Sequence, residues 1–150
     1  MKHVCCQVTE TRRGRCGEYS VLMLLFLEGL EYDTRYILDR EDHVSRARCD
    51  MLCCVSVTYY ANQVWVEVLV GGSWIHVDPC EASVDEPLLY ERWGKNQTFI
   101  FAFHQQNVAD VTRTYTTNHH AMLARRHMEG VNESFVVQLM KKSGEQLDQQ

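Results

Sequence analysis

The sequence lacks long apolar runs, has little proline and shows no repeat. Its longest uninterrupted apolar stretch, residues 21–27, falls far short of the roughly 18 residues that a membrane-spanning helix needs. The first residues do not resemble the apolar core of a signal peptide. Two prolines exclude a long proline-rich linker. We therefore expect a cytoplasmic protein without membrane insertion.

The sequence also lacks an excess of positive charge. It contains 15 basic and 20 acidic residues, for a formal net charge of −5. Because binding to nucleic acid usually requires a basic surface, we expect no DNA or RNA partner. The seven cysteines are odd in number, and two pairs of them are adjacent in sequence. Free thiols in a reducing compartment are therefore expected instead of a disulfide framework.

The 150 residues, 45% of them hydrophobic, suffice for a single globular domain. The run at residues 18–28, rich in leucine and methionine and followed by Gly29, predicts a buried helix that begins near Cys16. Further elements are predicted as strands over residues 33–38, 64–70, 73–78, 98–104 and 108–112, and as a helix over residues 118–128.

The dipeptide Gly71-Gly72 between two β-rich runs is a strong hairpin signal. A two-residue turn pairs Val70 with Ser73, and the same register places Asp78 opposite Trp65. The sequence thus predicts an antiparallel pair of strands with a defined register.

Cys16 is the candidate nucleophile. At a helix start, unpaired backbone N–H groups stabilise a thiolate, and Gly14 and Gly17 allow a substrate to approach the backbone. A cysteine at a helix start more often serves packing than catalysis. A nucleophilic thiol also needs a base and a group that orients the base.

The predicted hairpin offers such a pair. If residues 44–63 are disregarded, His43 directly precedes Val64 and becomes a diagonal cross-strand neighbour of Asp78. Such neighbours lie about 7 Å apart at the backbone, within reach of their side chains. His43 and Asp78 are therefore a candidate base and orienting acid.

Five ordered motifs run along the chain, and in order they are Thr11-Arg-Arg-Gly-Arg-Cys16-Gly-Glu-Tyr19, Asp42-His43 with Val64-Trp-Val-Glu67, Trp74-Ile-His-Val-Asp78-Pro-Cys-Glu81, Pro87-Leu-Leu-Tyr-Glu91 and Val111-Thr-Arg-Thr-Tyr115. Together they resemble the peptide:N-glycanase family within the transglutaminase-like cysteine enzymes. The resemblance implies an α+β core, transglutaminase-like and papain-like, in which the nucleophile helix packs on an antiparallel β-sheet. It covers residues 10–128, with a non-homologous or disordered start at 1–9 and a polar tail at 129–150, partly helical and then disordered.

The same resemblance implies the roles of individual residues. Cys16 would be the nucleophile, His43 the general base and acid, and Asp78 the group that orients His43. Trp65 and Glu81 would line the sugar-binding cleft. The implied reaction releases N-linked glycans from misfolded glycoproteins and converts Asn to Asp. Ubiquitin- and proteasome-linked factors of glycoprotein degradation are implied as partners, and we expect a monomer.

The chain departs from the family at two places. Residues 44–63 separate His43 from Val64, which are adjacent in the family. We hypothesise a retained intron, because Val44-Ser45 can be encoded by GTAAGT and Gln63 by CAG, the preferred intron ends. The family also carries two upstream cysteine pairs for a structural zinc, which we expect only in a longer parent protein, so no metal or cofactor is assigned to this chain. Both departures allow for an inactive chain.

Two other functions remain open. A transglutaminase-like cysteine protease or acyl transferase would use the same residues on plain peptides. A catalytically dead transglutaminase-like scaffold, as in DNA-damage recognition proteins, typically lacks the nucleophile, whereas Cys16, His43 and Asp78 are all present here. The net charge of −5 also argues against a role on DNA.

Overall fold

The computed structural model describes residues 8–40, 63–105, 107–128 and 138. A helical turn covers residues 8–11. The later elements are α2 (Cys16–Gly29), β1 (Thr34–Arg40), β2 (Gln63–Val70), β3 (Ser73–Asp78), β4 (Ser83–Val84), α3 (Leu89–Arg92), β5 (Phe99–His104), β6 (Asn107–Asp110), the 3₁₀ helix η2 (Thr112–Thr114) and α4 (His119–Met128). No helix among these residues is both long and apolar enough to span a membrane.

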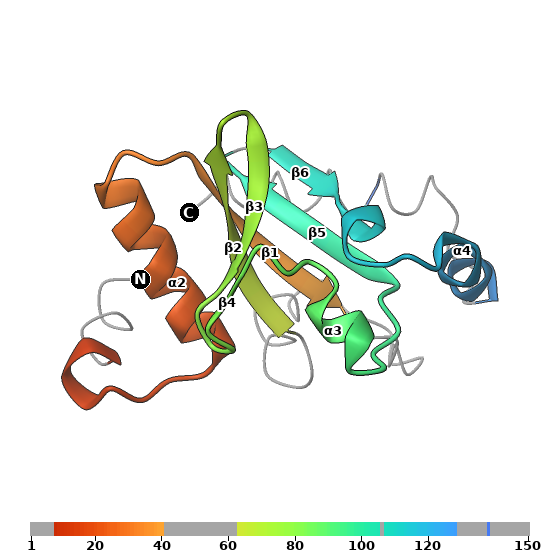
Figure 1. The fold of residues 1–150 in the computed structure, drawn as a ribbon, viewed down its shortest axis with the longest axis horizontal. Helices are drawn as coiled ribbons and strands as arrows, with labels where there is room; N and C mark the ends of the chain where they lie inside the picture. Colours follow the sequence, from red (N-terminus) through yellow and green to blue (C-terminus); the bar gives the residue numbers. More distant parts are fainter. Residues whose placement is uncertain (1–7, 41–62, 106, 129–137, 139–150) are drawn as a thin grey trace.

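The six strands form one sheet in the order β4-β3-β2-β1-β5-β6, and every neighbouring pair is antiparallel. Helix α2 lies on one side of this sheet, and α4 lies apart from α2, where its Arg126 contacts Phe99 of β5 and Asp110 of β6 (Figure 1). The expected α+β architecture, a helix packed on an antiparallel sheet, is confirmed.

The hairpin between β2 and β3 has the predicted register. Val70 pairs with Ser73, and the pairing continues to Val66 with Val77. Gly71 and Gly72 have φ angles of 58° and 83°, a left-handed conformation that glycine adopts without strain and that matches the twist of the two strands. The predicted pairing of Asp78 with Trp65 would be the next step beyond the last pair of this hairpin.

Helix α2 begins at Cys16 and ends at Gly29, as predicted. Its start is capped because Glu18 Oε2 accepts the Arg15 backbone N–H at 2.6 Å. The prediction of a buried helix is wrong: Ser20 is its only buried residue, and Phe26 is 58% exposed. The run is apolar on all sides of the helix, whereas β1 and β2 cover only one side.

Other differences concern short elements. Strand β4 and helix α3 were not predicted, because two and four residues are too short for a periodic pattern. The strand predicted over residues 108–112 is β6 followed by η2. The Thr112 hydroxyl donates to Asp110 Oδ1 at 2.6 Å and accepts the Ile100 N–H at 2.8 Å, and these bonds favour a turn at that point.

The two faces of the sheet are packed differently. On one face, Val64, Val66 and Val68 of β2 lie against α2. On the other face, residues from three strands and from the segments after β4 and β6 form the main apolar cluster, which comprises Ile37, Trp65, Tyr90, Ile100, Ala102, Val111 and Tyr115. Asp78 and Trp65 belong to this second face, so the candidate site lies at the edge of an aromatic core.

Candidate active site

Cys16 is the first residue of α2 and is half-buried. The helix start lies over the beginning of β2, since a Cβ atom added to Gly17 would lie 3.7 Å from Val64 Cγ2 and from Tyr36 Oη. The Ser20 hydroxyl donates to the Val64 carbonyl at 2.9 Å and holds the helix there. The first turn of α2 is therefore anchored at one end of the sheet.

Asp78 ends β3 and is only 1% exposed. Its Oδ1 accepts backbone N–H groups from Cys80 at 2.9 Å and Glu81 at 3.1 Å. Its Oδ2 accepts the Tyr90 hydroxyl at 2.5 Å. Three donors thus fix the plane of this carboxyl group.

Electrostatics link Cys16 to the same region. Burial raises the pKa of Tyr36 to about 12, and charge on Cys16 adds to the increase. The pKa of Tyr90 is raised mainly by burial and next by its hydrogen bond to Asp78. Cys16 makes a smaller contribution to the same increase. The pKa of Cys80 is raised by burial, then by Asp78, Glu81 and Cys16. Cys16 therefore lies within electrostatic range of Tyr90, the direct partner of Asp78.

The predicted base, His43, lies outside the described residues. The strand position before Val64, where His43 would stand without the extra segment, is occupied by Gln63. Gln63 had been assigned to the inserted loop, but it pairs with Asp39 as the first residue of β2, so the boundary moves by one residue. The Tyr90 hydroxyl lies 3.4 Å from Gln63 Oε1. A side chain at this position therefore reaches the Tyr90–Asp78 pair.

The two predicted sugar-binding residues differ in accessibility. Trp65 is 0% exposed, and its indole N–H donates to Tyr115 Oη at 2.9 Å. Aromatic packing on its face of β2 leaves Trp65 no exposed surface in this structure, and its place in a sugar-binding cleft stays a prediction. The Glu81 side chain is exposed beside Asp78. Its contact with a sugar remains a prediction.

Tyr90 and Gln63 had no place in the predicted site. The available signal for Tyr90 was its position in the motif Pro87-Leu-Leu-Tyr-Glu91. Nothing in the sequence places α3 against the end of β3, because that approach is a long-range contact. Gln63 could have been found by continuing the β2 pattern one residue toward the N-terminus.

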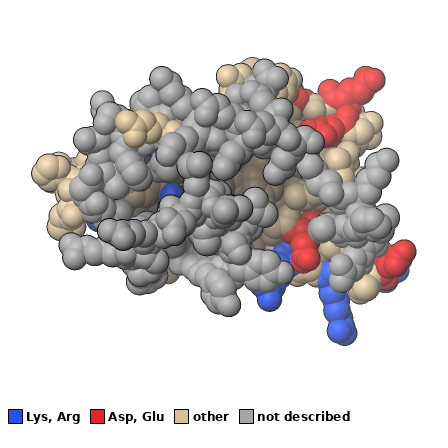
Figure 2. Space-filling model, turned by 180° about the vertical axis from the view of Figure 1, so that it is seen from behind, with Lys and Arg blue, Asp and Glu red and all other residues tan. Residues whose placement is uncertain are grey.

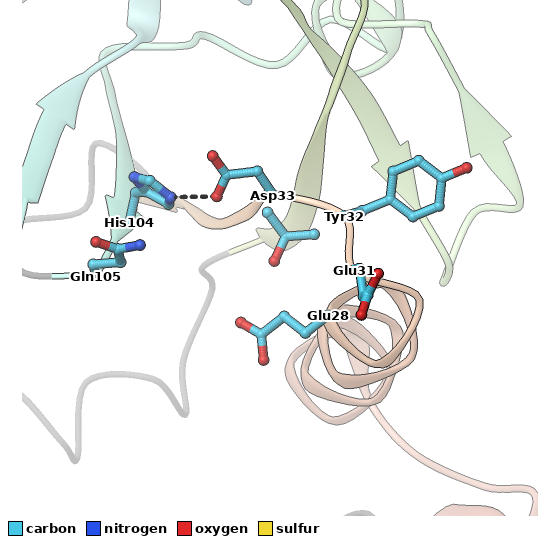
Figure 3. A pocket seen from close by; sticks show the side chains of 7 residues that line it. Glu28, Glu31, Tyr32, Asp33, His104 and Gln105 are labelled. Carbon is cyan, nitrogen blue, oxygen red and sulfur yellow. Dashed lines mark hydrogen bonds and ion pairs between the residues drawn. The ribbon is translucent and has the colours of Figure 1, made fainter.

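A pocket of about 450 Å³ opens at the other end of α2 (Figure 3), and it is lined by Glu28, Glu31, Tyr32, Asp33, Thr34, His104 and Gln105. His104 Nε2 lies 2.7 Å from Asp33 Oδ1 in its lining. The helix has 14 residues. At 1.5 Å per residue, the pocket is roughly 20 Å from Cys16 along α2 and lies apart from the candidate site.

No group of three or more His, Cys, Asp or Glu side chains within the described residues is arranged to hold a metal ion. In the rear view, the described residues show both acidic and basic side chains, without a continuous basic surface among them (Figure 2).

Comparison with known proteins gives a family match. The family model described as "Transglutaminase-like superfamily" matches residues 3–79, which include Cys16, His43 and Asp78. The match begins inside the stretch 1–9 that had been set aside as non-homologous. Val8 in that stretch is buried.

Several proteins that carry the same name are similar in sequence to this chain over most of its length. A Gallus gallus protein named peptide-N(4)-(N-acetyl-beta-glucosaminyl)asparagine amidase is 37% identical over 123 residues, covering 80% of this chain and 16% of the relative. Proteins of that name from Arabidopsis thaliana and Saccharomyces cerevisiae are 35% and 33% identical over 80% and 91% of this chain. The chain spans only 14% and 32% of these two relatives.

Proposed function

Since this chain belongs to the transglutaminase-like superfamily and is 33–37% identical to amidases of one name, we propose that it is the core of a peptide:N-glycanase. Such a hydrolase cleaves the amide bond between an N-linked glycan and asparagine. The observation that supports the proposal is that Cys16, at the start of α2, lies within electrostatic range of Tyr90, whose hydroxyl holds the buried Asp78 carboxylate at 2.5 Å.

The proposed reaction has two steps. In the first, the Cys16 sulfur attacks the side-chain carbonyl of the glycosylated Asn, His43 accepts the thiol proton, and the protonated imidazole then protonates the departing glycosylamine. In the second, water activated by His43 hydrolyses the thioester, which leaves Asp and regenerates the thiol. N–H groups at the start of α2 are suited to stabilise the oxyanion that forms in both steps. Asp78 orients the imidazole.

The position before Val64 explains why residues 44–63 matter. A glutamine amide is not a base at neutral pH, so Gln63 cannot replace His43 in these steps. In-frame removal of residues 44–63 would put His43 directly before Val64, at the strand position from which Gln63 reaches Tyr90. This supports the retained-intron hypothesis. Sequencing of cDNA across His43 and Val64 tests it, and a mature message that keeps the intervening codons would rule it out.

The wider setting follows from the family. We include in the proposal misfolded glycoproteins as substrates, the cytoplasm as location, and ubiquitin- and proteasome-linked factors as partners of a longer, monomeric parent protein that also holds the structural zinc. Glu81 is proposed as a sugar contact because its exposed side chain follows the Asp78 turn.

The test is glycan release from a denatured high-mannose glycoprotein. Four proteins are compared: the chain itself, a version without residues 44–63, and that shortened version with Cys16→Ala or with Cys80→Ala. We expect release by the shortened version and by its Cys80→Ala variant, since Cys80 is a nearby exposed thiol outside the proposed chemistry. Cys16→Ala should abolish it. An unglycosylated peptide assayed in parallel separates this amidase from a protease. A folded, shortened chain without activity would contradict the proposal.

A further inference from the structure

Tyr90 is the only side chain among the described residues with a recorded hydrogen bond to Asp78. The other two donors are backbone N–H groups of the turn that follows β3, on Oδ1. Within the part of the chain that the structure describes, Oδ2 receives only the Tyr90 hydroxyl, at 2.5 Å. The orientation of this second oxygen therefore depends on one phenol.

Packing leaves the Tyr90 ring little freedom. Tyr90 is 1% exposed, and its ring lies 5.3 Å from the rings of both Trp65 and Trp93. The Lys95 ammonium group lies 5.2 Å from the ring centre. The phenol oxygen is consequently placed by the aromatic core and by α3, not by the flexibility of a surface side chain.

The Tyr90 oxygen also reaches the position before Val64. A hydroxyl donates one hydrogen and can accept two more. Its one hydrogen is directed to Asp78 Oδ2 at 2.5 Å, and the same oxygen lies 3.4 Å from Gln63 Oε1, so an N–H donor placed at this strand position is within reach of the remaining lone pairs of the phenol. No hydrogen bond is recorded between Gln63 and Asp78. Tyr90 thus stands between them.

We propose that Tyr90 is the positioning residue of this site: its phenol fixes Oδ2 of Asp78 and accepts a hydrogen bond from the side chain that directly precedes Val64. The inference rests on the proposed function, in which that side chain is the base. It assigns the orientation of the base to a Tyr90–Asp78 pair instead of to Asp78 alone. The phenol keeps its proton throughout, consistent with the raised pKa that burial and Asp78 give Tyr90.

A purely structural role for Tyr90 predicts a different outcome, and Tyr115 supplies the matched control. Tyr115 is equally buried, and its hydroxyl donates to another buried carboxylate, that of Glu67. Tyr→Phe at either position removes one buried phenol–carboxylate bond. Only Tyr90→Phe removes a bond to Asp78.

The readout is the alkylation rate of Cys16 against pH in the version without residues 44–63. Trypsin releases Cys16 in a peptide that ends at Arg35 and contains no other cysteine, so mass spectrometry reports this thiol alone. A free thiol, with a pKa of about 8.5, hardly reacts near pH 5.5, whereas a thiolate paired with imidazolium does. The ratio of the rates near pH 5.5 and pH 9 therefore measures the coupling between Cys16 and the base.

We expect Tyr90→Phe to lower this ratio about 10- to 100-fold, as loss of a buried hydrogen bond to a charged group does. Tyr115→Phe should lower the melting temperature but leave the ratio unchanged. An unchanged ratio in Tyr90→Phe overturns the inference, and so does an equal drop in both variants. If the Tyr90 effect appears without glycan release by any version, the positioning role stands and the amidase proposal fails.

A second variant covers the case in which the shortened chain does not fold. Gln63→His in the full chain places an imidazole directly at the position before Val64. Alkylation of Cys16 near pH 5.5 should rise in Gln63→His relative to the parent, and Tyr90→Phe should remove the gain. A gain that survives Tyr90→Phe overturns the inference.

Discussion

The two faces of strand β2 are held by different forces. Toward α2, the strand presents aliphatic side chains, and the Ser20 hydroxyl of the helix donates to the Val64 carbonyl. On the opposite face, buried Trp65 and Glu67 belong to a polar and aromatic network. There, the Glu67 carboxylate accepts hydrogen bonds from Arg35 and Tyr115, and the Tyr115 hydroxyl accepts one from the Trp65 indole N–H.

This difference teaches where the molecule tolerates change. A substitution on the α2 face removes only a few apolar contacts, so it should lower the free energy of unfolding by a small amount. Removing one member of a buried polar network leaves its hydrogen-bond partners unsatisfied, so a single substitution on the opposite face should cause a large loss of free energy of unfolding. Asp78 and Tyr90 belong to the opposite face, which makes the candidate site rigid. The predictions below test this contrast.

The largest effect is expected on the network face. Glu67→Ala leaves Arg35 and the buried Tyr115 hydroxyl without their acceptor. Breaking a buried ion pair from one side typically costs about 3–5 kcal/mol, so urea unfolding should show a free energy of unfolding lower by about that amount. Glu10→Ala, at an exposed position, should change it by less than about 0.5 kcal/mol. A loss below about 1 kcal/mol for Glu67→Ala would remove the contrast between the faces.

His76 adds a pH dependence to the same face. It is 3% exposed, and neither ring nitrogen has a partner among the described residues. Burial lowers its pKa, and nearby carboxylates oppose this only in part, namely those of Asp78, Glu67, Glu86 and Asp85. Because the unfolded chain takes up the proton first, stability should fall as the pH drops below about 6.5 and continue to fall down to the lowered pKa.

Replacement tests this dependence. His76→Phe should flatten the stability profile between about pH 6.5 and the lowered pKa of His76, where the slope can reach about 1.4 kcal/mol per pH unit for one proton. The exposed replacement His120→Phe should leave the slope as it is. Thermal melts across this range give the measurement. An unaltered slope in His76→Phe would mean that other groups cause it.

A smaller effect is expected on the α2 face. Ser20→Ala removes the bond to the Val64 carbonyl, and a buried hydrogen bond contributes about 1 kcal/mol. Hydrogen exchange should then show faster opening of α2, with the exposed Ser73→Ala as control. A loss as large as that of Glu67→Ala would mean that this face is also a cooperative network.

The smallest effect should have the opposite sign. Thr34 lies on the α2 face, is 6% exposed, and its hydroxyl has no partner among the described residues. Thr34→Val removes this unsatisfied group at nearly constant shape and should raise the free energy of unfolding by up to about 1 kcal/mol. Thr98→Val should lower it, because the Thr98 hydroxyl accepts Arg125 Nε at 2.9 Å. Destabilisation by Thr34→Val would show that its hydroxyl is satisfied in solution.

Local patterns predicted some parts of the molecule well. The start of α2 at Cys16 and its end at Gly29 follow from helix-start and helix-stop residues, and the β2–β3 register follows from Gly71-Gly72. In each case a few neighbouring residues settle the geometry through capping or turn conformation. The α+β class and the family were also within reach, because five motifs occur in order along the chain.

One prediction that depended on surroundings failed. The apolar run of α2 indicated burial, yet Phe26 is exposed, since composition cannot say how many sides of a helix are covered. Surroundings also decide that Trp65 is fully buried in this structure. Its indole meets Tyr115, 50 residues away in the chain, a contact that no local pattern reveals.

The sequence by itself determined the order of elements, the hairpin register and the identities of Cys16, His43 and Asp78 as candidates, because these depend on residue type and short-range conformation. Only the tertiary structure decided that Tyr90 holds Asp78 and that Gln63 stands at the position before Val64. Those contacts form when distant segments pack together, and their geometry is set by the shared core.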